Sequence, residues 1–293
     1  PNETLPKGRK QKTTALYDRF VDQGAVMGDS FGLENVLWFA NNKEDAHEEP
    51  TIKRSRSHDY VSKEVINVRE NVGLIEVANF SKHEFKGSDA RKFLDHIMAG
   101  KLPKPGRISL SPMLSYRGKL CGDLTVACHD ENEFMVFGSG AAQEMHRRWF
   151  ESHLDKFNVN YKNRSDEYHG LSIAGPNSRK VLEKIVREDV TNEKFKFRDS
   201  RRMFVGSVPA IVNSISFTGE LGYEIYVLPH YQIKLYEELM EAGKEFNIKP
   251  FGSRALMSMR LEKNWGAWTL DYRPDFTPKE TGLDIFINWE KDF

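Results

Sequence analysis

Two acidic residues stand inside otherwise apolar segments of this 293-residue sequence, and they are the first candidates for chemistry. Asp123 lies in the run LCGDLTV and Glu224 in the run GYEIYV, both rich in residues that favour β-strands. A carboxylate on an apolar strand face is costly unless another group pairs with it or donates a hydrogen bond to it. We therefore expect Asp123 and Glu224 to converge on one pocket. The alternative is that either acid faces solvent on a half-exposed sheet.

Other reactive patterns are weaker. The segment 134–150, FMVFGSGAAQEMHRRWF, has the order strand, Gly-x-Gly loop, helix, which partly matches a dinucleotide-binding fingerprint. Gln143 stands where the third glycine would be, and no series of βαβ units surrounds the segment. The nine histidines form no HExxH motif and no close pair at ligand spacing. We therefore expect neither NAD or FAD binding here nor a metal site.

The bulk composition excludes several classes of protein. Lys plus Arg and Asp plus Glu are equal at 43 each, so nothing points to nucleic acid. No apolar run approaches the roughly 18 residues of a membrane span, and residues 1–12 lack the apolar core of a secretory signal. Cys121 and Cys128 form no CxxC pair, which favours a reducing compartment over a disulfide framework.

An internal repeat indicates how the chain positions the two acids. Residues 85–97, FKGSDARKFLDHI, and residues 173–185, IAGPNSRKVLEKI, align without a gap. Each copy predicts a strand end, a glycine turn and an amphipathic helix, with Ser88 or Asp89 and Asn177 as N-cap candidates. The alternative is chance, because helices readily share Lys, Leu and Ile. A true duplication predicts a twofold relation between two halves of the chain.

Similar segments follow each copy. Strand-like runs flank a glycine turn in both halves, and helices are predicted over about 142–155 and 231–246. We expect an α+β domain of two related halves, about 60–157 and 158–250, with Asp123 and Glu224 on equivalent strands. Before them we expect a mobile lead over residues 1–15, a charge-rich loop over 41–59 and a helix over 60–72.

Several motifs together resemble a known family. GLIEVANFSKHEFKG, GKLCGDLTV, LSIAGPNSRKVL, SFTGELGYEIYV and ALMSMRLEKNWGAW are similar, in this order, to the aminomethyltransferase family, which includes the T-protein of the glycine cleavage system. LYDRFVDQGAVMGDSFGLENVLWFA and the ending DYRPDFTPKETGLDIFINWEKDF are more similar to the folate-binding domain of dimethylglycine and sarcosine dehydrogenases. The resemblance covers about residues 14–293. It implies one folate-binding domain over residues 16–293, with two pseudo-symmetric α/β subdomains and the family's C-terminal β-barrel domain missing or truncated.

The resemblance also implies roles for the two acids. Glu224 would accept from the two parallel donors of a reduced pterin, its ring N3–H and 2-amino group, with Glu220 as the competing candidate. Asp123 would be the catalytic residue, because a carboxylate near folate N10 can orient the N10–H group and take its proton. T-proteins carry an arginine on a late helix where this chain has Leu256, and Arg254 is expected to point elsewhere.

Further residues would line the pocket by the same resemblance. Phe80 and Phe217 occupy positions where the family contacts the pterin or its linker, and Trp268 matches an aromatic residue that follows the RLE helix. Core packing is the commoner fate of aromatic residues and is the alternative for all three. Gly138 and Ser139 are expected to shape the folate pocket.

The predicted function is tetrahydrofolate-dependent transfer of a one-carbon unit from a demethylated amine, which forms 5,10-methylenetetrahydrofolate. FAD would be bound only by a dehydrogenase domain or subunit outside this chain. The competing hypotheses are a stand-alone tetrahydrofolate-dependent demethylase or methyltransferase, and a non-catalytic regulatory module. No nucleic acid or membrane partner is expected. The expected compartment is the cytoplasm, with the mitochondrial matrix as the alternative.

Overall fold

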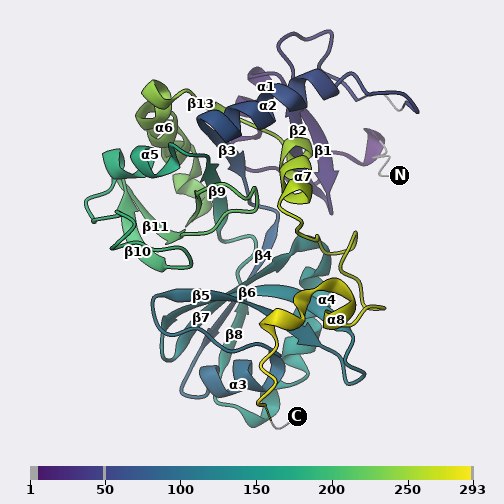
Figure 1. Ribbon diagram of the computed structural model, residues 1–293, viewed down its shortest axis with the longest axis vertical. Helices are drawn as coiled ribbons and strands as arrows, with labels where there is room; N and C mark the ends of the chain where they lie inside the picture. Colours follow the sequence, from purple (N-terminus) through teal and green to yellow (C-terminus); the bar gives the residue numbers. More distant parts are fainter. Residues whose placement is uncertain (1–5, 49–50, 292–293) are drawn as a thin grey trace. The chain divides into compact units, whose positions relative to one another are not determined.

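The computed structural model describes residues 6–48 and 51–291, and it divides into two compact units (Figure 1). Unit 1 comprises the chain up to Asn79 together with Glu167–Phe197 and Arg202–Trp265. Unit 2 comprises Phe80–Asp166, Arg198–Arg201 and the chain from Gly266 onward. These units differ from the predicted halves, because residues 60–79 belong to unit 1 together with most of the second half.

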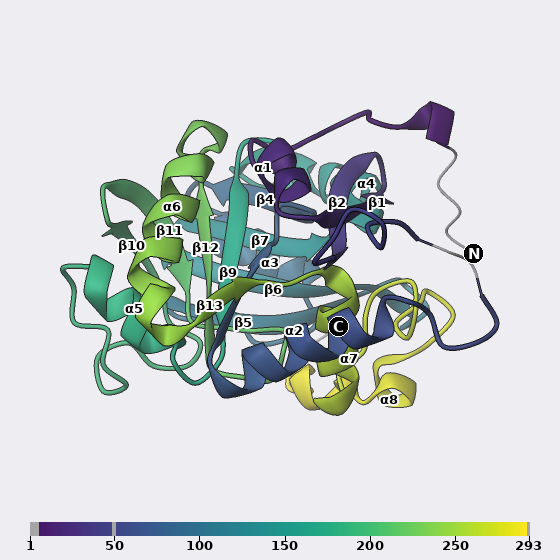
Figure 2. The ribbon, with the colours of Figure 1, turned by 90° about the horizontal axis from the view of Figure 1, so that it is seen from above.

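Unit 1 is built on a six-stranded sheet with two helices on one face. Tyr223 and Ile225 on β12 are fully buried and pack in one core cluster with Leu182 of α5 and Leu239 of α6. Figure 2 shows α5 and α6 side by side over the sheet, as their mutual contacts also indicate. The strands, in sheet order, are β10 (Ser200–Val205), β11 (Val208–Asn213), β12 (Gly222–Val227), β9 (His169–Ala174), β3 (Val72–Glu76) and β13 (Ile248–Pro250); the helices are α5 (Ser178–Ile185) and α6 (Gln232–Gly243).

The rest of unit 1 is a hairpin with three helices. Lys12 is hydrogen-bonded to Gly32 and Glu34, so this part of the predicted mobile lead is attached to the hairpin, and residues 1–5 lie outside the described residues. The loop predicted over 41–59 has no helix or strand before residue 58 among its described residues, and the helix predicted over 60–72 spans 58–70. The elements are α1 (Tyr17–Asp22), β1 (Ala25–Ser30), β2 (Leu33–Phe39), α2 (His58–Glu70) and α7 (Ser253–Glu262), with 3-10 turns at Pro6–Gly8, Pro229–Tyr231 and Lys244–Phe246.

Unit 2 is built on a five-stranded antiparallel sheet, which also has two helices on one face. Leu124 and Val126 on β6 are fully buried and pack in one core cluster with Phe93 of α3 and Phe150 of α4. The strands, in sheet order, are β5 (Arg107–Leu114), β6 (Leu120–Asp130), β7 (Glu133–Ser139), β4 (Phe80–Lys86) and β8 (Asn160–Asn163); the helices are α3 (Ala90–Ile97), α4 (Gln143–Glu151) and α8 (Pro278–Thr281), with 3-10 turns at Gly140–Ala142, Leu154–Lys156 and Leu283–Phe286.

The two copies of the sequence repeat adopt the same local structure. In each, a strand (β4 or β9) ends at a glycine with positive φ, +143° at Gly87 and +132° at Gly175, and an eight-residue helix follows. Asp89 and Asn177 occupy the predicted N-cap positions, but neither side chain makes a capping hydrogen bond. The predicted N-cap positions are therefore confirmed, and the Asp89 carboxylate accepts instead from the Asn158 backbone N–H at 3.0 Å.

The sheet orders correct one inference from the repeat. Since β4 corresponds to β9, the orders β5-β6-β7-β4-β8 and β10-β11-β12-β9-β3 match β6 with β11 and β7 with β12. Asp123 on β6 and Glu224 on β12 therefore do not lie on equivalent strands. The predicted equivalence aligned two glycine turns, but residues 116–118 connect β5 to β6 whereas residues 217–220 connect β11 to β12, one strand later.

Candidate functional site

The predicted site residues are distributed over both units, and each group is described within its own unit. Asp123 is on β6, Phe80 begins β4, and Gly138 and Ser139 end β7, all in unit 2. Trp268, in the C-terminal segment, also belongs to unit 2. Unit 1 holds Glu224 on β12 and Phe217 in the loop that precedes this strand.

The unit 2 residues gather near one end of the five-stranded sheet. Phe80 pairs directly with Ser139 across the β4–β7 ladder. On the neighbouring strand, Thr125 pairs with Phe137, and Asp123 lies two residues further towards the Ser139 end. Cross-strand partners share one face of a sheet, so Phe80, Ser139 and Asp123 all lie on the face opposite α3 and α4. Three predicted residues from separate segments thus share one surface of unit 2.

Asp123 has the electrostatic character of a group that exchanges a proton. Its side chain is half-buried, and burial raises the pKa of the carboxyl to about 7, an effect partly offset by a hydrogen bond from the residue's own backbone N–H. Near neutral pH both the acid and the carboxylate are therefore populated. A pKa close to the working pH favours general acid and base chemistry.

A buried histidine, for which no role was predicted, packs in this region. His146 on α4 is 1 % exposed, and its Nε2–H group donates to the Cys121 carbonyl at 2.9 Å. Its ring centroid lies 6.1 Å from that of Trp268. Burial lowers the pKa of His146 to about 4, so the ring is neutral at pH 7. Helical spacing does not distinguish His146 from the other polar residues of this charged segment.

Close packing within unit 2 requires a glycine at position 138. A Cβ atom at this position would lie 2.6 Å from Leu124 Cδ2, 3.1 Å from Ser81 Oγ and 3.2 Å from His146 Cε1. The glycine therefore lets β7 approach α4 closely, and Trp268 is 9 % exposed beside the same histidine ring.

In unit 1, Glu224 is a buried carboxylate with a tyrosine partner. It is 7 % exposed, and the Tyr226 hydroxyl donates to its Oε2 atom at 2.8 Å. Glu224 pairs across the sheet with Asn213 on β11 and Ser172 on β9. All four side chains lie on the face opposite α5 and α6. Burial, together with the nearby Glu224 charge, raises the pKa of Tyr226 well above its usual value, which keeps the phenol protonated.

Lys263 is a second residue that sequence reasoning missed. Its ammonium donates to the Ser216 carbonyl at 3.1 Å, next to Phe217, and burial lowers its pKa while the Glu224 charge raises it. Lys263 lines a pocket of about 150 Å³ together with Ser216, Glu220 and Gly222. A lysine just after a helix has no sequence signature that distinguishes it from a solvated one.

The competing acid, Glu220, is engaged elsewhere. It forms an ion pair with Arg69, which also binds Glu262 at 2.5 Å. On α7, Leu256 is half-buried, and Arg254 donates to Glu48 at 2.5 Å, so its side chain is committed to that acid.

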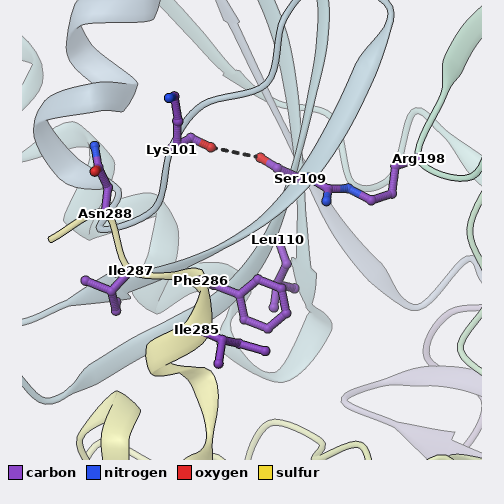
Figure 3. Close-up of a pocket in the computed structure, with 8 residues that line it drawn as sticks. All are labelled: Lys101, Ser109, Leu110, Arg198, Ile285, Phe286, Ile287 and Asn288. Atoms are coloured by element: carbon purple, nitrogen blue, oxygen red, sulfur yellow. Dashed lines mark hydrogen bonds between the residues drawn. The ribbon is translucent and has the colours of Figure 1, made fainter. Parts of the chain in front are cut away.

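A larger pocket of about 270 Å³ lies elsewhere in unit 2 (Figure 3). Leu110, Ile285 and Phe286 form its apolar end, and the Lys101 ammonium is directed away from them. Ser109 Oγ donates to the Lys101 carbonyl at 3.3 Å. No predicted site residue lines this pocket, and its size alone does not indicate a function.

Over residues 6–48 and 51–291, no three His, Cys, Asp or Glu side chains are grouped to hold a metal ion. Cys121 and Cys128 are both free thiols. No helix in the described part of the chain is long and apolar enough to cross a lipid bilayer.

Comparisons with known proteins identify the family of the chain. The family model for the GCVT N-terminal domain matches residues 16–291. Human mitochondrial dimethylglycine dehydrogenase is 35% identical over 295 residues, which cover 99% of this chain and 34% of that protein. An aminomethyltransferase of Desulfitobacterium hafniense (strain Y51) is 26% identical over 96% of this chain and 72% of its own length.

A solved structure shows the same fold. The glycine cleavage system aminomethyltransferase T from Bartonella henselae matches 95% of this chain and 70% of its own, with a TM-score of 0.80 at 21% identity. The predicted α+β T-protein fold and the resemblance to aminomethyltransferases are therefore confirmed. The chain spans about a third of the length of the dimethylglycine dehydrogenases that it matches. On the match over residues 16–291, the chain belongs to the family of the GCVT N-terminal domain.

Proposed function

We propose that this chain transfers a one-carbon unit to tetrahydrofolate and forms 5,10-methylenetetrahydrofolate, as the folate module of a dimethylglycine- or sarcosine-dehydrogenase-like enzyme. One observation carries the proposal: Asp123, with a pKa near 7, shares a sheet face with Phe80 and Ser139. Membership in the GCVT N-terminal domain family and the similarity to dimethylglycine dehydrogenases support the same reaction class.

Glu224 is the proposed partner of the pterin. The bidentate recognition expected of it needs an ionised, desolvated carboxylate, and Glu224 is 7 % exposed in an otherwise buried strand. The Tyr226 hydroxyl orients the carboxylate through Oε2. The nearby Glu224 charge acts to raise the pKa of Lys263, so the two side chains attract each other. Glu220 is the weaker candidate because it already forms an ion pair with Arg69.

Asp123 is the proposed catalytic residue. Bound tetrahydrofolate would supply N5 and N10 as the nucleophiles for a formaldehyde-level carbon. The carboxylate of Asp123 would accept a hydrogen bond from N10–H and take this proton as the carbon–nitrogen bond forms. For free formaldehyde the reaction balances as two N–H groups and one carbonyl giving a methylene bridge and water. Asp123 would then return its proton to the departing oxygen, which a pKa near 7 permits.

Other residues in each unit would contact the folate. Phe80 and Phe217 are half-buried and can present ring faces to a flat ligand. Ser139 offers a hydroxyl beside Phe80 on the same face as Asp123. Gly138 and Trp268 would act by packing around His146.

The partner of this module is proposed from its relatives. The human, rat and mouse relatives are named dimethylglycine dehydrogenases, which supports an FAD-dependent dehydrogenase domain or subunit as the source of the carbon unit from an N-methylated amine. The same names include the word mitochondrial, which favours the mitochondrial alternative over the cytoplasm.

Replacement of Asp123 by asparagine tests the reaction. The enzyme-dependent formation of 5,10-methylenetetrahydrofolate from tetrahydrofolate and formaldehyde is measured after subtraction of the uncatalysed rate. Asp123→Asn should lower kcat about 100-fold or more, because general acid–base catalysis contributes about 10²–10⁴. The Kd for tetrahydrofolate should change less than about threefold, since most contacts remain.

Three results would count against the proposal. Unchanged turnover in Asp123→Asn would show that Asp123 has no catalytic role. Tight folate binding by a wild-type chain that adds nothing to the uncatalysed rate would favour the regulatory module. Turnover only with a methyl donor, and none with formaldehyde, would favour the stand-alone methyltransferase.

A further inference from the structure

The strand that carries Asp123 contains a β-bulge two residues before it. In the β5–β6 ladder, Met113 pairs with Gly122 while Leu114 pairs with Leu120, so Cys121 is the extra residue. A bulged residue is unpaired in the ladder, and bulges beside active sites often redirect a neighbouring side chain. The direction of the Asp123 carboxylate therefore depends on the contacts that stabilise this bulge.

His146 holds the bulge through a single hydrogen bond. The Cys121 carbonyl can only accept, so the 2.9 Å contact to His146 fixes the imidazole as the Nε2–H tautomer. The ring is 1 % exposed, and its Nδ1 atom is buried without a hydrogen-bond partner among the described residues. The single hydrogen bond from this buried imidazole to one carbonyl indicates a more specific role for His146 than filling space in the core.

Two glycines provide the space for this ring. A Cβ atom at Gly122 would lie 2.8 Å from His146 Nε2, and one at Gly138 would lie 3.2 Å from His146 Cε1. Gly122 precedes Asp123, and Gly138 precedes Ser139. The histidine ring thus lies against the backbone of both strands that carry these predicted site residues.

A leucine could fill much of the same volume but could not make this hydrogen bond. It would leave the Cys121 carbonyl without its donor, which is unfavourable for a buried group unless the strand end opens to water. Opening would move Asp123, because β6 pairs with β7 only from Thr125 onward. Its first residues are held by β5 and by one hydrogen bond, from the Leu120 N–H to the Phe276 carbonyl at 2.9 Å.

We propose that His146 is a positioning residue for the one-carbon transfer: its hydrogen bond to the bulged Cys121 carbonyl sets the direction of the Asp123 carboxylate. The inference rests on the proposed function of Asp123. His146 acts through the strand, and no contact between it and the substrate is required.

The test compares His146→Leu, which removes the donor, with His146→Gln, whose amide can donate from a similar position. His83→Leu is the matched control, because His83 is equally buried but bonds to Tyr161 at 2.8 Å and not to β6. His146→Leu should lower kcat about 10–100-fold, the scale of a catalytic group misplaced by about 1 Å. The Kd for tetrahydrofolate should stay within about threefold, and His146→Gln and His83→Leu should keep kcat within about fivefold.

A second readout separates positioning from a general loss of packing. The titration of Asp123, followed by carbon-13 NMR of labelled aspartate, should move at least about one pH unit lower in His146→Leu, because water reaches the opened strand end. It should stay in place in His83→Leu. If His146→Leu does not fold, Gly122→Ala tests the same contact from the other side and should give the same kcat and titration changes.

The outcomes distinguish the inference from the function on which it rests. Wild-type kcat and an unmoved Asp123 titration in His146→Leu, or in Gly122→Ala where only that variant folds, overturn the inference, while an inactive Asp123→Asn leaves the proposed function standing. Equal losses in His146→Leu and His83→Leu also overturn it, because any buried histidine would then serve. Full turnover in Asp123→Asn overturns both.

Discussion

At the scale of single residues, burial shifts the pKa values of Asp123 and His146 in opposite directions. Burial raises the pKa of Asp123 to about 7 and lowers that of His146 to about 4. The Asp123 contribution to stability is therefore lost as pH rises through about 7. The His146 contribution is lost as pH falls below the unfolded value near 6.5. Between about pH 4 and pH 6.5 the two contributions change in opposite directions with pH, so they partly offset each other.

His83 offers a direct check of the acid side. Burial, followed by the charges of His146 and Lys82, lowers the pKa of His83 to about 3. Wild type should therefore lose about 2–3 kcal/mol between pH 6.5 and pH 4 from this residue, because only the unfolded chain takes up the proton. In His83→Leu this slope should be missing, so the difference in unfolding free energy from wild type should shrink as pH falls. Urea unfolding at several pH values measures it, and a constant difference would refute the assignment.

A raised carboxyl pKa does not by itself identify a site. Glu64 on α2 also has a pKa of about 7 because of burial, but its two oxygens accept from the Phe39 and Gly252 backbone N–H groups at 2.7 and 3.0 Å. Those bonds give it a structural role in unit 1. Asp123 and Glu224 could be selected from the sequence because acids interrupt apolar strands there. His146 and Lys263 could not, since their significance depends on contacts made only after folding.

At the scale of elements, the two glycine turns of the repeat are the most specific features. Gly87 has φ +143°, and a Cβ atom there would lie 2.3 Å from the Asn158 carbonyl oxygen. Gly87→Ala should therefore destabilise the protein by about 3 kcal/mol or more, from backbone strain and steric overlap together.

Gly118 is the matched control for this prediction. It also has positive φ, +69°, but a Cβ atom there would have no neighbour within 4 Å. Gly118→Ala should cost only about 1 kcal/mol. Thermal and urea unfolding of both variants would measure the difference. Equal costs would show that the close approach at Gly87 has no energetic weight.

The sequence predicted the elements better than their pairing. The repeat, its glycine turns and the helices near 142–155 and 231–246 follow from local patterns, which are set by residues close in the chain. The sheet orders do not, because β3 pairs with β9 in unit 1 while β8 pairs with β4 in unit 2. Each of these strands precedes one copy of the repeat and joins the sheet of the other. No local pattern encodes such an exchange between halves.

At the scale of the whole molecule, the chain has the T-protein fold and belongs to the GCVT N-terminal domain family. The family match and the T-protein fold cover nearly the entire chain. The chain nevertheless spans about a third of the dimethylglycine dehydrogenases it matches, so their full activity is proposed here only for a larger assembly. What this chain would contribute by itself is recognition of a reduced pterin by Glu224 and proton transfer by Asp123.

Recognition of the pterin is the central claim, and calorimetric titration with tetrahydrofolate tests it most directly. Glu224→Gln keeps an acceptor for Tyr226 but removes the charge and one of the two acceptor oxygens. It should raise the Kd about 10–150-fold, which corresponds to about 1.5–3 kcal/mol for charged hydrogen bonds. Glu220→Gln, in which the competing acid is changed in the same way, should bind within about threefold of wild type. Equal affinity of all three proteins, or a loss confined to Glu220→Gln, would contradict the account.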